Sequence, residues 1–575
     1  MTASTTIRRS DDTPAAEGLL RDAPLPPWLR PARLGVVLFA VLWMVSLLVD
    51  PNGYLSTDTG GKTAALVALE RNGGADLDLG YWAEAHDPDG SLFPMFSTRH
   101  FDDGGWVNAT TLPMLYVAAP LHQAGGMRAA LVLPVLGSVA AALAAGALAR
   151  RLARRQPEHA AAAATVVVGL AGPATVYALD FWEHSIGLAL MGWAMVGVHD
   201  ALERASRSGH LAAFAAGAGF GAAATMRQEA LVYGFVAGLA LLAIGWARNG
   251  PRIVTRGGAM VLGTLVPLAA NAMLERAVLG SASRADRGFG TAAAAGSDLG
   301  LRVEEAFVTG FGSSGSLSVL AIVSGVFATA GLAGLGLAGG SDGRRRSVAL
   351  VAVGFAPLVL SLLALGLRFV PGMVFATPLA GLGFAAMRRP AAADRAPLAV
   401  AIGAMPLVWA VQYTGGAGPQ WAGRYILLSG FLLTVVAVSR FWADRREVVA
   451  GVAGLGLAVT LAGVAWTVQR ADAFAGLSAE LAAAPEPVLV FSDPFVSREA
   501  GPIVLDEQWL AAWTDERRAL AGEVVVASGH DEFGYVNRER EPDVPIFAGF
   551  RPVSERFIEV FDGYRFRVTT FVAEP

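Results

Sequence analysis

Residues 33–49 read RLGVVLFAVLWMVSLLV, and the polar stretch Ser56-Thr57-Asp58-Thr59-Gly60-Gly61 follows a few residues later. The apolar segment approaches the ~20 residues that cross a bilayer as a helix. It follows a polar N-terminal segment and lacks a small-residue cleavage site, so we predict an uncleaved membrane anchor rather than a signal peptide. Asp58 then lies just outside the membrane, where the longest polar loop begins.

The composition is that of an integral membrane protein. Of the 575 residues, 54% are hydrophobic and only 16% are charged, whereas soluble domains are about 25% charged. The 68 glycines suit close helix packing in lipid, where small residues let two backbones approach. The chain has no cysteine, which excludes disulfides and thiolate metal sites.

Apolar stretches of membrane-spanning length recur along the chain. We predict an all-α polytopic membrane protein with about thirteen transmembrane helices. The stretch at 211–225 is short for a span, and 112–123 is either a further partial span or an interfacial segment. The thirteen predicted spans are 33–49, 128–149, 160–178, 184–200, 211–225, 230–247, 259–274, 316–338, 348–366, 370–386, 397–413, 426–440 and 448–468.

Arginines are concentrated in alternate connections between these spans. Because positively charged loops stay cytoplasmic, the amino terminus is predicted to lie inside. An odd number of spans places the carboxyl terminus outside, as expected for a multi-pass protein of the plasma membrane. The clusters include Arg150/Arg151/Arg154/Arg155, Arg344/Arg345/Arg346 and Arg440/Arg445/Arg446.

The chain is predicted to have three parts. Residues 1–32 form a cytoplasmic tail, and residues 33–470 form the transmembrane domain with a large outer loop at 50–127. Residues 471–575 are charged, rich in aromatics and punctuated by prolines, which predicts a small extracytoplasmic α/β domain. Within it we expect buried strands at 488–491 and 524–526, an alternating strand at 564–571 and a helix at 505–520.

The first outer loop contains a predicted short interfacial helix from Lys62 to Glu70, which the Gly73-Gly74 pair would end. Asp58 just precedes this helix, and its carboxylate has two interpretations. It is an N-cap, a position for which neighbouring hydroxyl residues also compete. Alternatively it takes a proton from an acceptor hydroxyl, because an ionised carboxylate at the membrane surface suits general-base catalysis.

Several arginines fall on the predicted outer side, where a guanidinium group can bind phosphate through two hydrogen bonds. Arg227 either pairs locally with Glu229 or contributes to such a site. Arg424 follows a glycine-rich segment and is flanked by Trp421 and Tyr425, which fit an interfacial aromatic belt. It either reaches lipid headgroups or is buried against a phosphate, which we prefer. The other outer arginines are Arg99, Arg284, Arg287, Arg302 and Arg368.

The fourth predicted span opens with Asp180-Phe181-Trp182-Glu183-His184. Asp180 and Glu183 have the spacing of a capping box. His184 either donates a hydrogen bond to a phosphate or hydroxyl, or is an ordinary interfacial histidine. The spacing of Asp58, Glu183 and His184 defines no metal-binding geometry, so we predict no metal site and no cofactor and leave metal dependence open.

These residues resemble the pattern of the GT-C superfamily of polytopic membrane glycosyltransferases, in particular protein O-mannosyltransferases and the aminoarabinose transferase that acts on lipid A. The resemblance covers roughly residues 33–470. It is carried by Asp58 early in the first outer loop, by the outer-turn pair Arg227 and Glu229, and by a late Gly-Pro-x-Trp-x-x-Arg-Tyr element. That element comprises Gly418, Pro419, Trp421, Arg424 and Tyr425.

The chain also departs from that pattern. Many relatives carry an Asp-Glu pair where Asp58 is followed by Thr59. The metal-binding Asp-x-Asp of oligosaccharyltransferases is matched in letters by Asp76-x-Asp78 and Asp87-x-Asp89, but both lie in predicted turns. The metal question and the subfamily are therefore open.

The resemblance implies a hexosyl or pentosyl transferase that moves a sugar, with inversion, from a polyprenyl-phosphate donor to a hydroxyl acceptor. The acceptor would be an envelope glycan, lipid or protein, and no nucleic acid would take part. The implied site faces outward beneath the first loop, with Asp58 as its base. The donor phosphate would lie on Arg424, Arg227 and His184, supported by Glu183, Glu229, Trp421 and Tyr425.

Other classes of protein have the same composition. A transporter or lipid flippase would carry charges within its spans, but the predicted span interiors are almost free of charge. A non-catalytic assembly protein would use residues 471–575 as a binding module. A ligase or polymerase of surface glycans would transfer a preassembled glycan from a lipid pyrophosphate.

Overall fold

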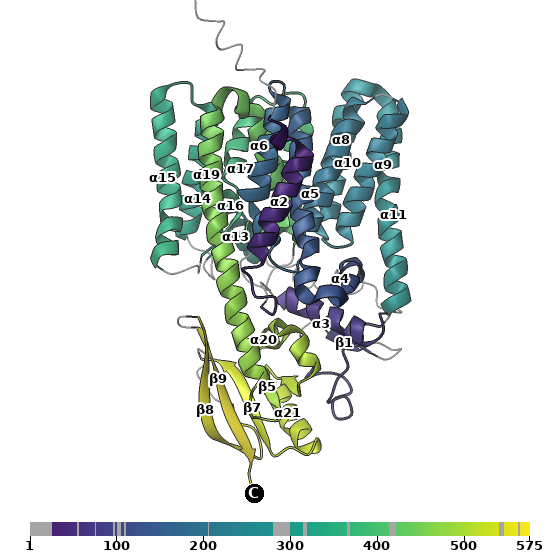
Figure 1. The fold of residues 1–575 in the computed structure, drawn as a ribbon, viewed down its shortest axis with the longest axis vertical. Coiled ribbons are helices and arrows are strands. Elements are labelled where there is room, and N and C mark those ends of the chain that lie inside the picture. Colours follow the sequence, from purple (N-terminus) through teal and green to yellow (C-terminus); the bar gives the residue numbers. More distant parts are fainter. Residues whose placement is uncertain are drawn as a thin grey trace, which may run out of the picture.

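The computed structural model shows a bundle of helices with a smaller mixed sheet beyond one of its ends (Figure 1). It describes residues 26–53, 57–74, 76–95, 98–100, 105–108, 111–204, 206–279, 299–313, 319–364, 369–412, 421–539, 545–561 and 564–575. Arg284, Arg287, Arg368, Gly418 and Pro419, together with the side chain of Arg99, lie outside this description.

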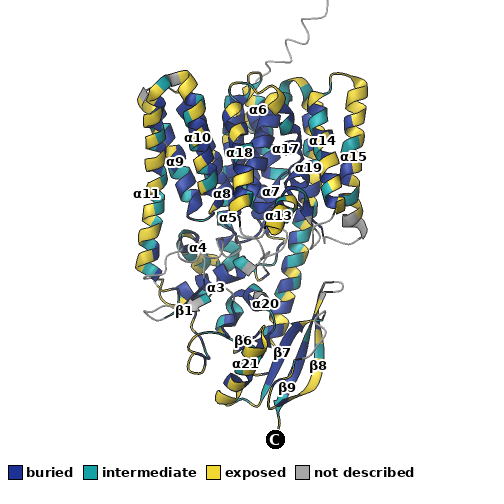
Figure 2. Cartoon of the chain, turned by 180° about the vertical axis from the view of Figure 1, so that it is seen from behind, coloured by how far each residue is buried: buried dark blue, intermediate teal, exposed yellow. Residues whose placement is uncertain are grey.

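The bundle is built from apolar helices whose outer faces remain uncovered. Figure 2 shows exposed residues along the outward sides of the peripheral helices, such as α11 (Ile253–Leu279). On α11 these include Val261, Leu262 and Leu265, each more than half exposed. A patch of this size and character needs lipid to cover it. The chain is therefore a membrane protein by its surface as well as by its composition.

Besides α11, the described residues of the bundle form ten helices of 14 to 56 residues. They are α2 (Pro31–Ser46), α5 (Val132–Leu152), α6 (Pro157–Leu170), α8 (His184–Glu203), α9 (Ser206–Ala224), α10 (Glu229–Asn249), α14 (Val319–Leu337), α15 (Ser341–Ala364), α18 (Arg395–Val411) and α19 (Leu427–Ala482). Shorter helices are α7 (Pro173–Tyr177), α13 (Leu299–Phe311), α16 (Met373–Ala376) and α17 (Pro378–Gly383).

Within the described residues, six helices are long and apolar enough to cross a membrane, so the predicted count of thirteen is not confirmed. Several predicted spans are short or interrupted. The 160–178 stretch is divided into α6 and α7 at Gly172, whose backbone is extended, and Pro173 occupies the first turn of α7, where its missing N–H costs no hydrogen bond. The segment at 112–123 belongs to α4 (Leu112–Ala130), which is broken at Gly125 and Gly126.

Helix α19 contains 56 residues, and a straight helix of that length would measure about 84 Å. It reverses direction instead. Its helical geometry breaks at Arg445 (φ −141°, ψ 40°), and Arg424 before the helix and Arg498 after it both contact Asp58. The two predicted spans at 426–440 and 448–468 thus lie on either side of this break.

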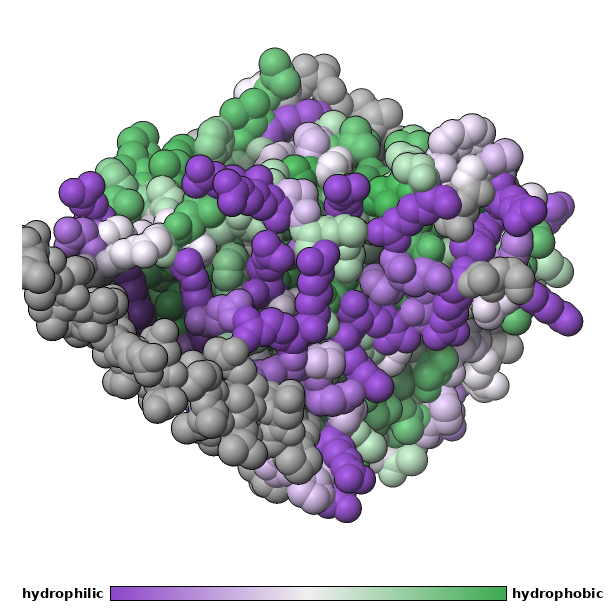
Figure 3. All heavy atoms as spheres, turned by 90° about the horizontal axis from the view of Figure 1, so that it is seen from above, coloured by the Kyte–Doolittle hydropathy of each residue, from purple (hydrophilic) through white to green (hydrophobic). Residues whose placement is uncertain are grey.

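The predicted inside loops gather at the end of the bundle opposite the sheet. A band of hydrophilic side chains crosses this end, with hydrophobic side chains on both sides of it (Figure 3). Arg155 contacts Asp444 at 2.5 Å, and Arg248 pairs with Glu203, so connections far apart in sequence meet there. The clustering agrees with the alternation of arginines along the chain.

The C-terminal part holds a five-stranded sheet in the order β6-β5-β7-β9-β8. Strand β5 runs parallel to β6 and β7, whereas β7, β9 and β8 are antiparallel. The strands are β5 (Leu489–Phe491), β6 (Trp509–Ala511), β7 (Glu532–Arg538), β8 (Phe550–Phe561) and β9 (Tyr564–Ala573). The predicted strands at 488–491 and 564–571 correspond to β5 and β9.

One local prediction in this part is wrong and another holds only in part. Val524–Val526 belongs to helix α21 (Asp515–Ala527) rather than to a strand, and the helix expected at 505–520 begins only at Asp515, because residues 509–511 form β6. The parallel strands explain both differences, because a parallel pair needs a crossover connection, usually helical. Tertiary pairing here overrides the strand preference of three successive valines.

The first loop and the C-terminal part pack into one body. Helix α3 (Thr57–Arg71) lies against α20 (Pro494–Glu499) and the 3₁₀ turn η5 (Gly501–Leu505). Arg71 forms a bidentate bridge to Asp506 at 2.9 and 2.8 Å. Trp82 Nε1 donates to the carbonyl of Trp509 at 3.0 Å. The loop is thereby held in a defined place between bundle and sheet.

Candidate active site

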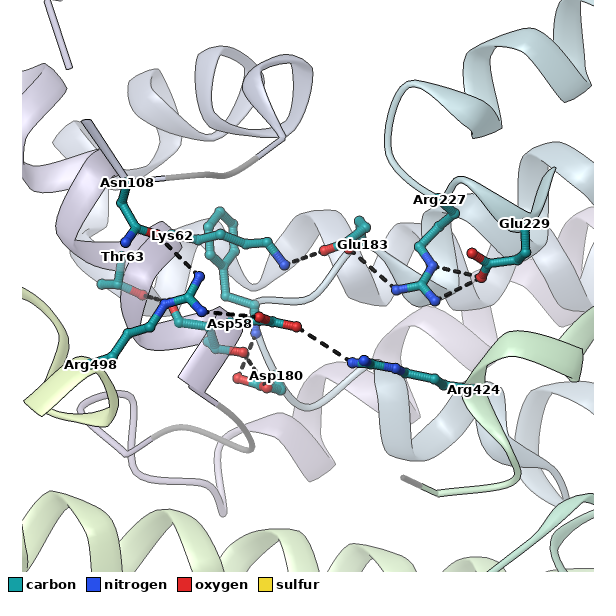
Figure 4. A network of polar contacts seen from close by, with 12 residues as sticks. Asp58, Lys62, Thr63, Asn108, Asp180, Glu183, Arg227, Glu229, Arg424 and Arg498 are labelled. Atoms are coloured by element: carbon teal, nitrogen blue, oxygen red, sulfur yellow. Dashed lines mark hydrogen bonds and ion pairs between the residues drawn. The ribbon is translucent and has the colours of Figure 1, made fainter. Parts of the chain in front are cut away.

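Asp58 lies in the first turn of α3 rather than before the helix, and Lys62 follows one turn later on the same side. The carboxylate contacts two arginines from distant parts of the chain (Figure 4). Its Oδ2 lies 3.4 Å from Nη1 of Arg424, and its Oδ1 lies 3.4 Å from Nη1 of Arg498. The N-cap interpretation therefore does not describe the contacts of this side chain.

The exposure of the three side chains differs sharply. The side chain of Asp58 is 34% exposed, whereas those of Arg424 and Arg498 are 7% and 6% exposed. Burial works to raise the pKa of Asp58, but Arg498, Arg424 and Lys62 outweigh it and hold the pKa at about 2. The carboxylate is therefore ionised at neutral pH and still open to a substrate.

Arg424 is placed by a tight backbone turn into the 3₁₀ segment η4 (Arg424–Ile426). Gly423 has φ +61°, and a Cβ there would lie 2.1 Å from the carbonyl oxygen of Thr309, so only glycine fits. The guanidinium donates to the Tyr425 hydroxyl at 2.6 Å and lies over the rings of Tyr425 and Trp182. Because Arg424 is buried among these groups, the headgroup-snorkelling interpretation is wrong.

Trp421 is buried rather than part of an outward aromatic belt. Its carbonyl accepts a hydrogen bond from the Tyr177 hydroxyl at 2.6 Å, and its ring packs against Trp466 with centroids 5.8 Å apart. These contacts attach the Arg424 turn to helices α7 and α19.

A chain of alternating charges runs beside Asp58. Lys62 pairs with Glu183, and the other oxygen of Glu183 lies 3.5 Å from Arg227 Nη1. Arg227 also bonds Glu229 through Nε at 2.8 Å, so the local Arg–Glu pair is present. Burial works to raise the pKa of Glu183, but Lys62 and Arg227 hold it below its ordinary value.

The capping-box interpretation of Asp180 and Glu183 is wrong. Glu183 precedes α8 without a side-chain cap bond, because Lys62 and Arg227 engage its carboxylate. Asp180 accepts hydrogen bonds from the Thr59 hydroxyl at 2.7 Å and from the backbone of Phe181. Both acids therefore tie α8 to neighbouring elements.

His184 is buried at the start of α8. Its ring stacks on Tyr177 with centroids 4.6 Å apart and meets Trp182 at 4.0 Å. Among the described residues, neither ring nitrogen of His184 has a hydrogen-bond partner, and the same holds for Trp182 Nε1 and Arg424 Nε. Buried donors normally find partners, so these groups keep an unused capacity for hydrogen bonding beside Arg424.

Two contributors escaped the sequence analysis. Arg498 occupies a short helix with no recognisable motif, and only the fold brings it to Asp58. Lys62 did carry a signal, since it is the only lysine of the chain and follows Asp58 by one helical turn. Arg302, another of the predicted outer arginines, donates a hydrogen bond from Nη1 to the carbonyl of Trp409 at 3.4 Å.

The acidic pairs of the first loop form turns. Asp78 Oδ1 accepts from the backbone amides of Gly80 and Trp106, and Asp87 accepts from Tyr81 and Leu92. In the part of the chain that the structure describes, no three acidic or histidine side chains gather as they would around a metal ion. Two guanidinium groups already flank Asp58, and their positive charge favours binding of an anion there over binding of a metal cation.

Comparison with solved structures shows a shared fold. The chain is similar to ArnT from Cupriavidus metallidurans bound to undecaprenyl phosphate, with a TM-score of 0.51 and 14% identity over 93% of this chain and 97% of that chain. At this identity the likeness concerns the fold, and the predicted resemblance to the GT-C glycosyltransferases is confirmed at that level.

Two further structures, both from Archaeoglobus fulgidus, match less closely. The oligosaccharyltransferase in complex with Zn and sulfate has a TM-score of 0.44 and 13% identity, over 87% of this chain and 67% of that chain. The oligosaccharyltransferase AglB with an inhibitory peptide and a dolichol-phosphate has a TM-score of 0.41 and 12% identity, over 87% and 69%. No family model and no curated protein matches the chain.

Replacing Glu183 with Gln should destabilise the protein by about 3–5 kcal/mol, because it leaves two buried cations without their shared carboxylate. The measurement is thermal unfolding of the detergent-solubilised protein. Since the pKa of Glu183 is lowered on folding, its stabilisation is present above the unfolded carboxyl pKa of about 4.3 and fades as the pH falls further. The variant and the wild type should therefore converge in acid.

The matched control is Glu203→Gln at the other end of α8. Glu203 pairs with Arg248 at the surface and is 48% exposed, so its loss should cost at most about 1 kcal/mol. Equal destabilisation by the two variants would contradict the importance of the buried pair.

Proposed function

We propose that the chain is a membrane glycosyltransferase that moves a sugar from a polyprenyl-phosphate donor to a hydroxyl acceptor on the extracytoplasmic face. The observation that carries the proposal is the partly exposed Asp58 carboxylate between buried Arg424 and Arg498. The fold shared with ArnT, whose structure holds undecaprenyl phosphate, supports it. On this proposal, residues 1–32 are cytoplasmic and residues 471–575 form an extracytoplasmic domain.

The donor phosphate is proposed to lie on the Arg424 side of Asp58. Arg424 Nε, Trp182 Nε1 and the ring of His184 have no partner among the described residues, and a phosphate oxygen can accept from each kind of group. Arg227 lies over the Tyr425 ring at 5.5 Å and adds positive charge behind Arg424. These groups would neutralise the charge that develops on the phosphate as the sugar leaves.

Asp58 is proposed to act as the general base. The acceptor hydroxyl oxygen forms a bond to the anomeric carbon while the bond from that carbon to the phosphate oxygen breaks. The proton passes to Asp58, and polyprenyl phosphate departs. A carboxylate with a pKa of about 2 is a weak base. A phosphate that binds Arg424 would break the ion pair between Arg424 and Asp58, and the loss of that pair would raise the basicity of Asp58.

A small apolar hollow between helices lies near the site, and widening of this hollow is proposed to admit the first part of the prenyl chain. Leu188 lines it one helical turn beyond His184, and Leu427 lines it three residues beyond Arg424. Its other walls come from helices α6, α7, α17 and α19. A phosphate on Arg424 and His184 would thus have its lipid tail directed between helices of the bundle.

Asp58→Asn should lower sugar transfer by ~10²-fold or more, because the amide cannot accept the acceptor's proton. The measurement is release of polyprenyl phosphate by purified protein from undecaprenyl-phosphate-linked mannose, glucose and arabinose. The control is Asp89→Asn, an exposed acid of the same loop, which should retain full activity. Normal turnover by Asp58→Asn would remove the proposed base, and absence of sugar release by the wild type with every donor would favour a transporter or assembly protein.

Arg424→Ala should weaken binding of undecaprenyl phosphate by ~10-fold or more, because it removes a charged hydrogen-bonding partner of the phosphate. Binding can be followed by titration of the solubilised protein. Arg302→Ala removes another outer arginine and should leave the affinity unchanged. An unaltered affinity in Arg424→Ala would count against the proposed phosphate position.

Ala453→Phe should fill the hollow and raise the KM for a long-chain donor by ~10-fold. A short-chain, water-soluble donor analogue should be affected far less, because it does not need the hollow. The control is Gly454→Phe at the next position along the helix. Gly454 is exposed, and no atom lies within 4 Å of a Cβ added there. Equal effects of both variants on both donors would place the prenyl chain elsewhere.

A further inference from the structure

Arg498 reaches the Asp58 carboxylate from the C-terminal part of the chain. It lies on α20, and its two terminal nitrogens have different partners. Nη1 lies 3.4 Å from Asp58 Oδ1, and Nη2 donates to Asn108 Oδ1 at 3.1 Å. Figure 4 shows Arg424 and Arg498 approaching Asp58 from opposite directions. Each guanidinium therefore holds a different oxygen of the same carboxylate.

The approach of Arg498 depends on the Gly60-Gly61 pair in α3. A Cβ at Gly60 would lie 1.9 Å from the carbonyl oxygen of Arg498. A Cβ at Gly61 would lie 2.6 Å from Asn108 Oδ1 and 2.7 Å from Arg498 Nε. Glycine inside a helix costs about 1 kcal/mol relative to alanine. The close contact with α20 gives a physical reason for two glycines in succession here.

We propose that Arg498 is a positioning residue for the base, so that the site is complete only when the C-terminal part is docked on the first loop. The inference rests on the proposed function and deepens it. When the donor phosphate occupies Arg424, the Asp58 oxygen that Arg424 held is released, while Arg498 keeps the other. The freed oxygen, Oδ2, is then the atom that accepts the proton, and Oδ1 fixes its direction.

The charges around Asp58 support this assignment. The cations that face it are Arg498 from α20, Arg424 from η4, Lys62 from α3 and Arg227 from the turn before α10. Lys62 and Arg227 are engaged by Glu183, and Asp180 is engaged by Thr59. The remaining charged contacts of α3 lie at its far end, where Glu70 pairs with His122 and Arg71 with Asp506. Arg498 is thus the cation left to Asp58 once phosphate engages Arg424.

Arg498→Gln should lower kcat by ~10-fold or more, because the Asp58 carboxylate loses its orientation. The KM for the donor should change by less than about twofold, because Arg424 still binds the donor phosphate. The substitution should also move the acid side of the pH–activity profile upward by roughly 1–3 pH units, because removal of a neighbouring cation raises the carboxyl pKa. Arg498→Lys should restore most of both properties. The assay uses the full-length protein and the donor turned over among undecaprenyl-phosphate-linked mannose, glucose and arabinose.

The matched control is Arg71→Gln, which breaks the bridge to Asp506 in the same interface without touching Asp58. It should leave the pH profile unchanged. Equal shifts in Arg71→Gln and Arg498→Gln would reduce Arg498 to a docking contact and overturn the inference. So would a wild-type kcat and pH profile in Arg498→Gln.

Failure of the inference is distinguishable from failure of the proposed function. If Asp58→Asn is inactive while Arg498→Gln behaves as wild type, the base stands and the positioning residue falls. If Asp58→Asn is fully active, the proposed base and the positioning role of Arg498 fall together, whereas absence of sugar release by the wild type with every donor means that the proposed function itself fails. Should Arg498→Gln not fold, Arg498→Met repeats the test with a neutral side chain that keeps the apolar packing of the arginine stem.

Discussion

The two ion pairs of Asp58 are the constraint on which the site depends. They join three regions far apart in sequence, namely the first loop, the turn before α19 and the C-terminal α20. A buried guanidinium without a counter-charge would be costly, so burial of Arg424 and Arg498 requires this carboxylate. The carboxylate in turn keeps enough exposure to meet a substrate. Structure and proposed chemistry therefore draw on the same three charges.

The surrounding residues make this concentration of charge tolerable. Glu183 forms ion pairs with both Lys62 and Arg227, and Glu229 forms a second ion pair with Arg227. The aromatic rings of Trp182 and Tyr425 lie against the Arg424 guanidinium, where the ring faces attract a cation. Charge is thus compensated along the chain from Lys62 to Glu229, whereas Nε of Arg424 and Nε of Arg498 have no hydrogen-bond partner among the described residues.

Much of this organisation could be predicted from local sequence. Asp58 and Arg424 stood out because each is a charged residue beside an apolar span. The helix predicted from Lys62 to Glu70 is present as part of the longer α3. The capping box failed because a spacing of three residues cannot reveal that Lys62, 121 positions away, engages Glu183. The strand expected at 524–526 failed because parallel pairing of β5 with its neighbours demands a helical crossover. In each failure a long-range contact outweighed a local preference.

By itself, the sequence determined the membrane class, the alternation of arginines and the short set of candidate site residues. These follow from hydropathy, charge and spacing, which are properties of a few neighbouring residues. Only the tertiary structure decided that Arg498 meets Asp58, that Trp421 is buried, and which stretches are broken rather than continuous helices. The physical reason is that ion pairing and close packing depend on distances in space, and no local pattern near position 498 records its distance to position 58.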